Sequence, residues 1–197
     1  ESLSNIDSVF ETLHERSEEF LDRFDAPDQW VPLEVESVTS NLKSFFDAVA
    51  QNSKGKYQIV YDVTQQSDGD YAVQFDIGSA SGNTITMPPV FQDVIRDLAA
   101  NARKYTDPGG MIDIGIYEDD EMLRFAVRDT GRGIPADEIE SVVDFGTRAT
   151  NAHDKRTKGG GFGLTKAYHV TKEFGGRMWI ASEEGEGTTI RIAIPRP

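Results

Sequence analysis

Three polar residues recur at helical spacing in the segment from Asp93 to Thr106, which reads DVIRDLAANARKYT. Asp97 and Asn101 are one turn apart and Lys104 follows three positions later, so a helix would carry all three on nearly one side. A carboxylate, an amide oxygen and an ammonium group in one patch suit a hydrated Mg²⁺ ion and the phosphates it bridges, because Mg²⁺ takes few protein ligands and keeps its waters. Taken alone, such a segment is more often an ordinary surface helix.

A second candidate site is the motif DTGRGIP, residues 129–135, at the end of a strand pattern. The Asp129 carboxylate only accepts hydrogen bonds, so it would pair with the exocyclic amine of adenine and reject the carbonyl oxygen of guanine. Gly131 and Gly133 would let the backbone approach a flat ring closely. The structural alternative is a tight glycine turn followed by Pro135 at the first position of a helix.

Two further glycine motifs follow along the chain. The run GGGFGLT, residues 159–165, would bring backbone N–H groups to phosphate oxygens and direct the positive end of a helix at the same anion. It lacks the spacing of a dinucleotide fingerprint, and the chain has no Gly-Lys-Ser/Thr phosphate loop. The motif GEGTT, residues 185–189, is either a simple hairpin turn or a support for an adenine pocket.

A basic stretch precedes the glycine run. Residues 148–158 contain only one acid, Asp154, and four bases: Arg148, Lys155, Arg156 and Lys158. Such a polar, basic loop is typical either of a mobile cover over phosphates or of a solvated surface loop, and the sequence favours neither.

Hydrophobic periodicity predicts the elements that must position these motifs. The helix within 93–106 should bury one apolar stripe, formed by Val94, Ile95, Leu98, Ala102 and Tyr105. Further helices are expected at 38–49, 135–143 and 162–174. Strands are expected at 57–63 and 71–77, joined by a turn at 68–70, and in two hairpins, 111–117 with 122–128 and 177–182 with 188–195. This order indicates an α+β fold in which helices cover one face of a largely antiparallel sheet.

The chain divides near residue 28. Before that point, residues at alternating steps of three and four form a heptad pattern, which is typical of a helix that packs against a partner helix: Leu3, Ile6, Phe10, Leu13, Ser17, Phe20 and Phe24. The segment is acidic, with nine Asp and Glu residues against Arg16 and Arg23. Packing of the stripe on its own domain is the alternative.

Composition excludes several classes of function. The 197 residues carry a formal net charge of −14, which argues against nonspecific binding of nucleic acid. The chain has no cysteine, which fits a reducing compartment, and we expect a cytoplasmic location. No hydrophobic run is long enough to span a bilayer, so we expect no membrane contact from this part. Because the sequence opens on Glu1, we expect a fragment of a longer protein that could carry a membrane anchor elsewhere.

Together and in this order, the motifs resemble the ATP-binding domain of sensor histidine kinases, within the superfamily that also contains gyrase, heat-shock chaperone and mismatch-repair ATPases. The resemblance covers about Trp30 to Pro197 and includes the closing motifs GGRMWIAS and GEGTT. It implies a Bergerat-type fold, a two-layer α/β sandwich, for residues 29–197. It also implies that residues 1–28 are the last part of a dimerisation helix.

The resemblance implies ATP and Mg²⁺ as ligands and gives roles to individual residues. Asn101 would bind Mg²⁺, Lys104 would contact a phosphate and Tyr105 would lie against adenine. The adenine pocket would consist of Asp129, the residues Gly131 to Gly133, and Ile134, supported by Thr188. The phosphate end would contain Arg148 and residues of the glycine run: Gly159, Gly161, Phe162, Gly163 and Leu164.

Two features depart from the family pattern. The residue one turn before Asn101 is often Asn in these kinases and is Glu in the ATPase relatives, where it activates water; here it is Asp97, and its role stays open. A phosphoacceptor histidine is also missing, because the chain offers only His14, His153 and His169, and none of them sits in a complete acceptor motif. We therefore expect the acceptor helix to lie outside this sequence.

The resemblance implies a protein-histidine kinase, in which the γ-phosphoryl group of Mg-ATP passes to a histidine on a dimerisation helix. The expected partners are that helix, the receiver domain of a response regulator, and a second copy of the full-length protein in a homodimer. Two alternatives are a gyrase-like ATPase clamp, in which Asp97 activates water, and a nucleotide-sensing interaction module without catalysis.

Overall fold

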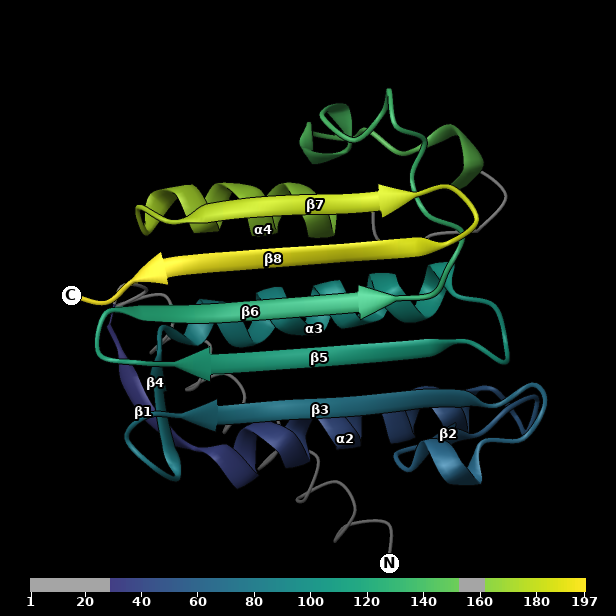
Figure 1. The fold of residues 1–197 in the computed structure, drawn as a ribbon, viewed down its shortest axis with the longest axis horizontal. Coiled ribbons are helices and arrows are strands. Elements are labelled where there is room, and N and C mark those ends of the chain that lie inside the picture. The colour runs from purple at the N-terminus through teal and green to yellow at the C-terminus, as the bar shows by residue number, and fades with distance from the viewer. Residues whose placement is uncertain (1–28, 153–161) are drawn as a thin grey trace, which may run out of the picture.

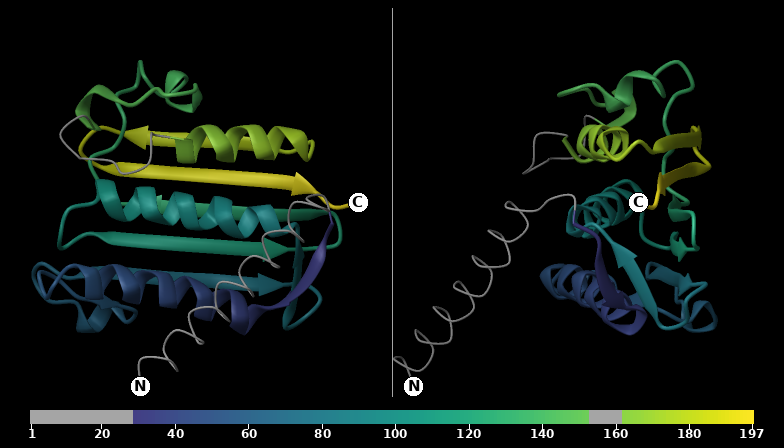
Figure 2. Two further views of the ribbon diagram at one scale, coloured as in Figure 1. Left: turned by 180° about the vertical axis from the view of Figure 1, so that it is seen from behind. Right: turned by 90° about the vertical axis from the view of Figure 1, so that its left-hand side faces the viewer.

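The computed structural model describes residues 29–152 and 162–197, and its main feature is one six-stranded sheet in the order β2-β3-β5-β6-β8-β7. The strands are β2 (Ile59–Val60), β3 (Tyr71–Ser79), β5 (Met111–Glu118), β6 (Met122–Asp129), β7 (Arg177–Glu183) and β8 (Gly187–Pro195). Three helices lie behind the sheet in Figure 1: α2 (Val35–Asn52), α3 (Pro89–Tyr105) and α4 (Phe162–Glu173). Seen edge-on in Figure 2, the helices and strands form two layers. The predicted two-layer α+β fold is confirmed.

The sheet is mixed but largely antiparallel. β3 pairs with β2 and β5 in parallel, whereas β5–β6, β6–β8 and β7–β8 are antiparallel pairs. Both predicted hairpins are confirmed, because β5 and β6, and likewise β7 and β8, are joined by short turns. The β6–β8 pair places Asp129 opposite Thr188. Two motifs that are 59 positions apart in the sequence therefore meet where these two neighbouring strands end.

The helix α3 packs at the centre of the helix layer, between α2 and α4 (Figure 1). Four residues of its predicted stripe are buried, namely Val94, Ile95, Leu98 and Ala102. At its N-terminal end the Phe91 ring stacks on Phe125 of β6, with 5.2 Å between the ring centroids. The stripe thus fixes how α3 is rotated about its axis and leaves its polar residues away from the core.

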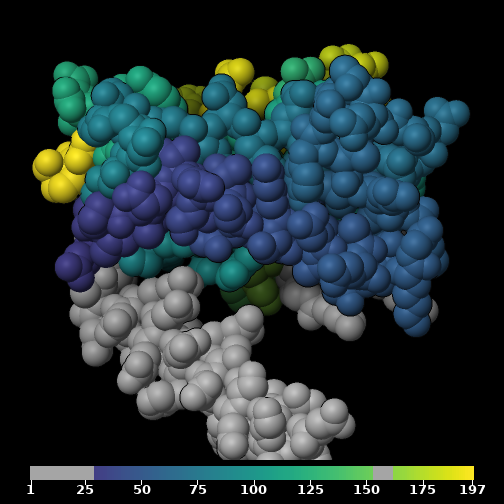
Figure 3. Space-filling view, turned by 90° about the horizontal axis from the view of Figure 1, so that it is seen from below, coloured from purple at the N-terminus to yellow at the C-terminus, as the bar shows by residue number. Residues whose placement is uncertain are grey.

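A small second sheet closes one end of the molecule. β1 (Val31–Glu34) and β4 (Thr84–Met87) pair antiparallel, and neither strand was predicted. Buried Glu118 at the end of β5 holds them, because its carboxylate accepts a 2.9 Å hydrogen bond from the Thr86 N–H and forms a 3.1 Å ion pair with Arg196. Figure 3 looks onto the side where β1, α2 and the following residues cover the lower edge of the molecule.

The strand predicted over residues 57–63 is confirmed only in part, although the turn at 68–70 and the strand after it are present. Only Ile59–Val60 pair, in parallel with β3. The Asp62 carboxylate accepts a 3.0 Å hydrogen bond from the Thr64 N–H and opens the 3₁₀ helix η1 (Val63–Gln65). This side-chain cap ends the extended conformation, because an Asp side chain offers the backbone a turn in place of a ladder.

The predicted helix over 135–143 was also wrong. The segment makes a turn with a 2.9 Å bond from the Glu138 N–H to the Pro135 carbonyl, and then the 3₁₀ helix η2 (Ser141–Val143). The Ser141 hydroxyl donates to the Glu138 carbonyl, and the Glu138 carboxylate accepts from the Thr150 N–H at 2.8 Å. These local bonds compete with a regular helix. A third 3₁₀ helix, η3 (Thr150–Ala152), follows.

The predicted coiled-coil-like helix falls on residues 1–28, which lie outside the described residues.

Candidate functional site

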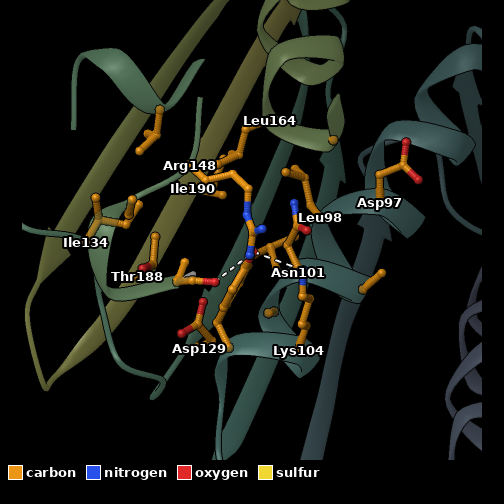
Figure 4. Close-up of a pocket in the computed structure, with 18 of the residues that line it drawn as sticks. Asp97, Leu98, Asn101, Lys104, Asp129, Ile134, Arg148, Leu164, Thr188 and Ile190 are labelled. Atoms are coloured by element: carbon orange, nitrogen blue, oxygen red, sulfur yellow. Dashed lines mark hydrogen bonds between the residues drawn. The ribbon is translucent and has the colours of Figure 1, made fainter. Parts of the chain in front are cut away.

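A pocket of about 450 Å³ lies between α3, α4 and the ends of β6 and β8. Most of the predicted site residues line it: Asp97, Asn101, Lys104, Tyr105, Asp129, Gly133, Ile134, Arg148, Phe162, Gly163, Leu164 and Thr188. Gly131 lies next to the pocket and binds Asp129, whereas Gly159 and Gly161 fall outside the described residues. Figure 4 shows Asp129 and Asp97 at opposite ends of the cavity, with Asn101 between them.

The polar face of α3 forms one wall of the pocket. Asp97, Asn101 and Lys104 line the cavity together, as their spacing predicts, and the buried residues Leu98 and Ala102 of the same helix also line it. The Lys104 ammonium donates a 3.1 Å hydrogen bond to the Tyr105 hydroxyl and lies 4.7 Å from the centroid of the Tyr105 ring. This wall therefore presents an amide and a cation beside an aromatic ring.

Asp129 forms the other end of the pocket. Its Oδ1 atom accepts a 2.8 Å hydrogen bond from the Gly131 N–H. Burial raises the pKa of the Asp129 carboxyl to about 6, while the backbone N–H groups of Gly131 and Thr188 act in the opposite direction by stabilising the charged form. A carboxylate that is costly to bury and is only partly compensated by backbone donors is suited to receive a further donor from a ligand.

The glycines after Asp129 are required by close packing. A Cβ atom at Gly131 would lie 2.5 Å from the Tyr105 carbonyl oxygen, and one at Gly133 would lie 2.0 Å from the Glu183 carbonyl oxygen. Gly133 also has a positive φ of 67°, which favours glycine. The DTGRGIP motif thus packs against the end of α3 on one side and the β7–β8 turn on the other. It makes a tight turn that lines the pocket, but no helix begins at Pro135.

A hydrogen-bond network fixes Ile134 and Thr188 beside Asp129. The Ser182 hydroxyl accepts from the Ile134 N–H at 2.8 Å, lies 2.9 Å from the Thr188 hydroxyl, and donates to the Gly187 carbonyl at 2.9 Å. The GEGTT turn therefore supports the pocket wall as well as closing a hairpin. Ile134 in turn packs in a small apolar cluster with Val142, against which the Tyr105 ring also lies.

The first turn of α4 closes the pocket beside Asn101. A Cβ atom at Gly163 would stand 2.9 Å from the Asn101 side-chain nitrogen and 3.6 Å from the Asp97 Cβ atom. Phe162 precedes this glycine and is partly exposed, with its ring 4.7 Å from that of exposed Phe145. The described part of the glycine run therefore lies against the polar face of α3.

Two cationic side chains, Arg148 and Lys166, line the pocket, and only the first was predicted as a site residue. Arg148, predicted to reach a phosphate, lines the pocket and hydrogen-bonds to the Ala152 carbonyl. Lys166 was not predicted as a site residue, yet it lines the pocket and forms a 3.0 Å ion pair with Asp97. Its position three residues after Gly163 in a helix is the signal that would have identified it.

The described residues contain no cluster of three His, Cys, Asp or Glu side chains that could hold a metal ion by themselves. His169 of α4 is exposed and does not line the pocket, while His14 and His153 fall outside the described residues. Of the helices that the structure describes, none has the length and apolar character of a membrane span.

Residues 86–197 match the family model described as histidine kinase-, DNA gyrase B-, and HSP90-like ATPase. Similar curated proteins include the sensor histidine kinase WalK of Bacillus subtilis, 36% identical over 104 residues, and the adaptive-response sensory kinase SasA of Synechococcus elongatus, 34% identical over 109 residues. These matches cover 52% and 55% of this chain, but only 17% and 28% of the two relatives.

Solved structures share the fold at lower sequence identity. The catalytic domain of the histidine kinase ThkA has a TM-score of 0.59 at 16% identity, covering 85% of this chain and 95% of that domain. Full-length ShkA, solved in complex with AMPPNP, has a TM-score of 0.60 at 20% identity, covering 85% of this chain and 31% of that protein. The chain therefore belongs to the histidine kinase-, DNA gyrase B- and HSP90-like ATPase family, and it is an ATP-binding domain of the sensor histidine kinase type.

Proposed function

We propose that this domain binds Mg-ATP in the pocket between α3 and α4 and presents the γ-phosphoryl group to a histidine carried by a dimerisation helix. The observation that carries the proposal is that one cavity joins Asp129, at one end, to Asn101 and Lys104 of α3, with Asn101 lying between Asp129 and Asp97 (Figure 4). An adenine ring beside Asp129 would leave its phosphates near the two polar residues of α3. The expected binding set also includes Gly159 and Gly161, which lie outside the described residues.

Asp129 would select adenine. Its carboxylate only accepts hydrogen bonds. Burial disfavours its charged form, and a hydrogen bond from the exocyclic amine of adenine would stabilise that form. The carbonyl oxygen of guanine at the same position would face the carboxylate and be repelled. Tyr105, Ile134 and Thr188 would enclose the base, because they line the same cavity as Asp129.

The residues around Asn101 fit Mg²⁺ as a cofactor. Asn101 supplies an amide oxygen, and an ion that also binds phosphates and water needs only one or two protein oxygens. Mg²⁺, when bound, would neutralise charge on the phosphates. Lys104 and Arg148 line the same cavity and would add positive charge to the phosphate end.

In the proposed transfer, the lone pair of a neutral imidazole nitrogen forms a bond to the γ-phosphorus. The bond from that phosphorus to the oxygen bridging the β and γ phosphates breaks, and ADP leaves with its electron pair. Positioning and charge neutralisation provide most of the catalysis, because phosphoryl transfer requires little covalent help from the protein. The polar wall of α3 would hold the phosphates in line with the incoming nitrogen.

The proposed partners follow from the same reaction. The histidine would come from an acceptor helix outside this sequence, and residues 1–28 would be the last part of a second dimerisation helix. The full-length protein would form a homodimer through the heptad pattern of these residues. A response regulator receiver domain would take the phosphoryl group from the histidine.

Calorimetric titration of the chain with Mg-ADP, Mg-ATP and Mg-GTP tests the pocket. We expect adenine nucleotides to bind and GTP to fail, and we expect Asp129→Asn to weaken binding at least about ten-fold, because hydrogen bonds to charged groups contribute roughly 1.5–3 kcal/mol. Asp120→Asn, which removes an exposed acid outside the pocket, is the matched control. Equal affinities for ATP and GTP would contradict the adenine assignment.

The kinase step is tested on the longer protein that includes the upstream helices. With radiolabelled ATP we expect an acid-labile phosphate on one histidine, which Asp129→Asn should abolish. A protein that binds Mg-ATP but never labels a histidine would instead be a nucleotide-sensing module.

A further inference from the structure

The ion pair between Asp97 of α3 and Lys166 of α4 is a feature that neither nucleotide binding nor the fold requires. The Lys166 ammonium donates a 3.0 Å hydrogen bond to Oδ2 of Asp97, and both side chains are 38% exposed. Ion pairs between partly exposed side chains contribute little to folding stability. The two helices are already held together by apolar packing, with Leu98 and Ala167 both buried in one core cluster.

The pair stands at the phosphate end of the pocket. Asp97 lies one helical turn from Asn101, and the Gly163 backbone packs against both residues. Asp97 and Lys166 themselves line the cavity. In Figure 4 the Asp97 carboxylate lies on the side of Asn101 that is remote from Asp129, so it is close to the phosphates in the binding mode proposed above.

A free carboxylate at this position would have a chemical consequence. A water oxygen could form a bond to the γ-phosphorus while a proton of that water passes to the carboxylate. The bond from the phosphorus to the bridging oxygen would break, and ADP and inorganic phosphate would leave. Such general-base assistance typically accelerates a reaction about 10²–10⁴-fold. The ion pair with Lys166 engages Oδ2 of Asp97 and fixes the direction in which the carboxylate points, so the carboxylate cannot turn toward that water.

We propose that Lys166 is a positioning residue that holds the Asp97 carboxylate away from the water molecule that would attack the γ-phosphorus, and thereby directs the γ-phosphoryl group to histidine instead of hydrolysis. This inference rests on the proposed function, because it assumes that Mg-ATP occupies the pocket. It also assigns a role to Asp97: the carboxylate that could have activated water is kept inactive by its partner on α4.

The test is hydrolysis of Mg-ATP by the chain, followed as phosphate release. Lys166→Met removes the ammonium group and keeps a side chain of similar length, and we expect its rate to rise at least about ten-fold. The double variant Lys166→Met/Asp97→Asn should lose that gain, because the amide cannot take the proton. Lys166→Arg, which keeps the ion pair, should stay slow. Lys172→Met, on an exposed turn of the same helix, is the matched control and should leave the rate unchanged.

A further measurement separates this role from a structural one. In the longer protein, Lys166→Met should form less phosphohistidine for each ATP consumed. Titration of each variant with Mg-ADP separates failure of this inference from failure of the proposed function. A wild-type chain that binds no adenine nucleotide overturns the proposed function. Variants that bind normally without faster hydrolysis in Lys166→Met overturn the role of Lys166.

Discussion

The backbone of Gly163 lies so close to Asn101 that a side chain at position 163 would contact the Asn101 amide, with only 2.9 Å between an added Cβ atom and the side-chain nitrogen. The obstructing atom is the end of a side chain, so Asn101 would move and the backbone would not. Glycine at the start of α4 therefore keeps the proposed Mg²⁺ ligand in place.

Gly163→Ala should consequently weaken nucleotide binding without lowering the folding stability. We expect unchanged or slightly higher stability, because alanine favours a helix by about 0.5–1 kcal/mol over glycine, together with weaker binding of Mg-ADP. Urea unfolding and calorimetry measure the two quantities. Gly78→Ala is the control, since its Cβ would meet only Tyr117 at an ordinary 3.9 Å. Full Mg-ADP affinity in Gly163→Ala would show that the position of Asn101 does not matter for binding.

Adenine affinity should depend on pH through Asp129. Its pKa is raised to about 6 by burial, and a carboxylate that accepts from the adenine amine must be ionised. About one tenth of the carboxyls are ionised at pH 5 and nearly all at pH 8, so affinity should fall about ten-fold between pH 8 and pH 5. Titration with adenosine, which has no phosphate to titrate, isolates this effect. An affinity that stays constant over this range would exclude the ionised carboxylate as the acceptor.

The same carboxyl should make folding stability depend on pH. Because the folded pKa is raised from 3.8 to about 6, the folded protein holds the proton more tightly, and this stabilisation is complete below pH 3.8 and is lost as pH rises through about 6. From pH 5 to pH 8 the free energy of unfolding of the wild type should fall by about 1.4 kcal/mol relative to that of Asp129→Asn, because the asparagine amide does not titrate. Urea unfolding at both pH values measures the difference. Asp120→Asn should show no such change, and a constant difference for Asp129→Asn would contradict the raised pKa.

The parts of the fold that the sequence predicts are those set by local periodicity. The stripe from Val94 to Ala102 identifies α3 because a helix buries every third or fourth residue, and the two hairpins are marked by alternation around short turns. The pairing of β1 with β4 was missed, because strands of four residues carry little signal and Val31 meets Met87 across more than fifty positions. The errors at Asp62 and Ser141 arise from single side chains that hydrogen-bond the backbone and override the local pattern.

The candidate site was predictable where the motif itself touches the cavity. Asn101, Lys104 and Asp129 all line one pocket. Asn101 and Lys104 lie in the last turns of α3 and Asp129 is the last residue of β6, and the apolar core packs this helix against this strand. The partnership of Asp97 with Lys166 was not predictable, because it depends on how α3 and α4 pack, and residues 69 positions apart give no sign of it in one sequence.

The two glycines of the GEGTT turn provide a matched comparison. Both have positive φ, 87° at Gly185 and 122° at Gly187, but a Cβ at Gly185 would meet nothing within 4 Å, whereas one at Gly187 would lie 2.0 Å from the Asp129 carbonyl oxygen. Gly185→Ala should therefore cost only backbone strain, about 1–2 kcal/mol. Gly187→Ala should cost about 3 kcal/mol or more, because backbone must also move, and it should weaken adenosine binding by displacing Asp129. Urea unfolding and adenosine titration of both variants measure this, and equal losses of stability would mean that the contact between Gly187 and the Asp129 backbone does not constrain the site.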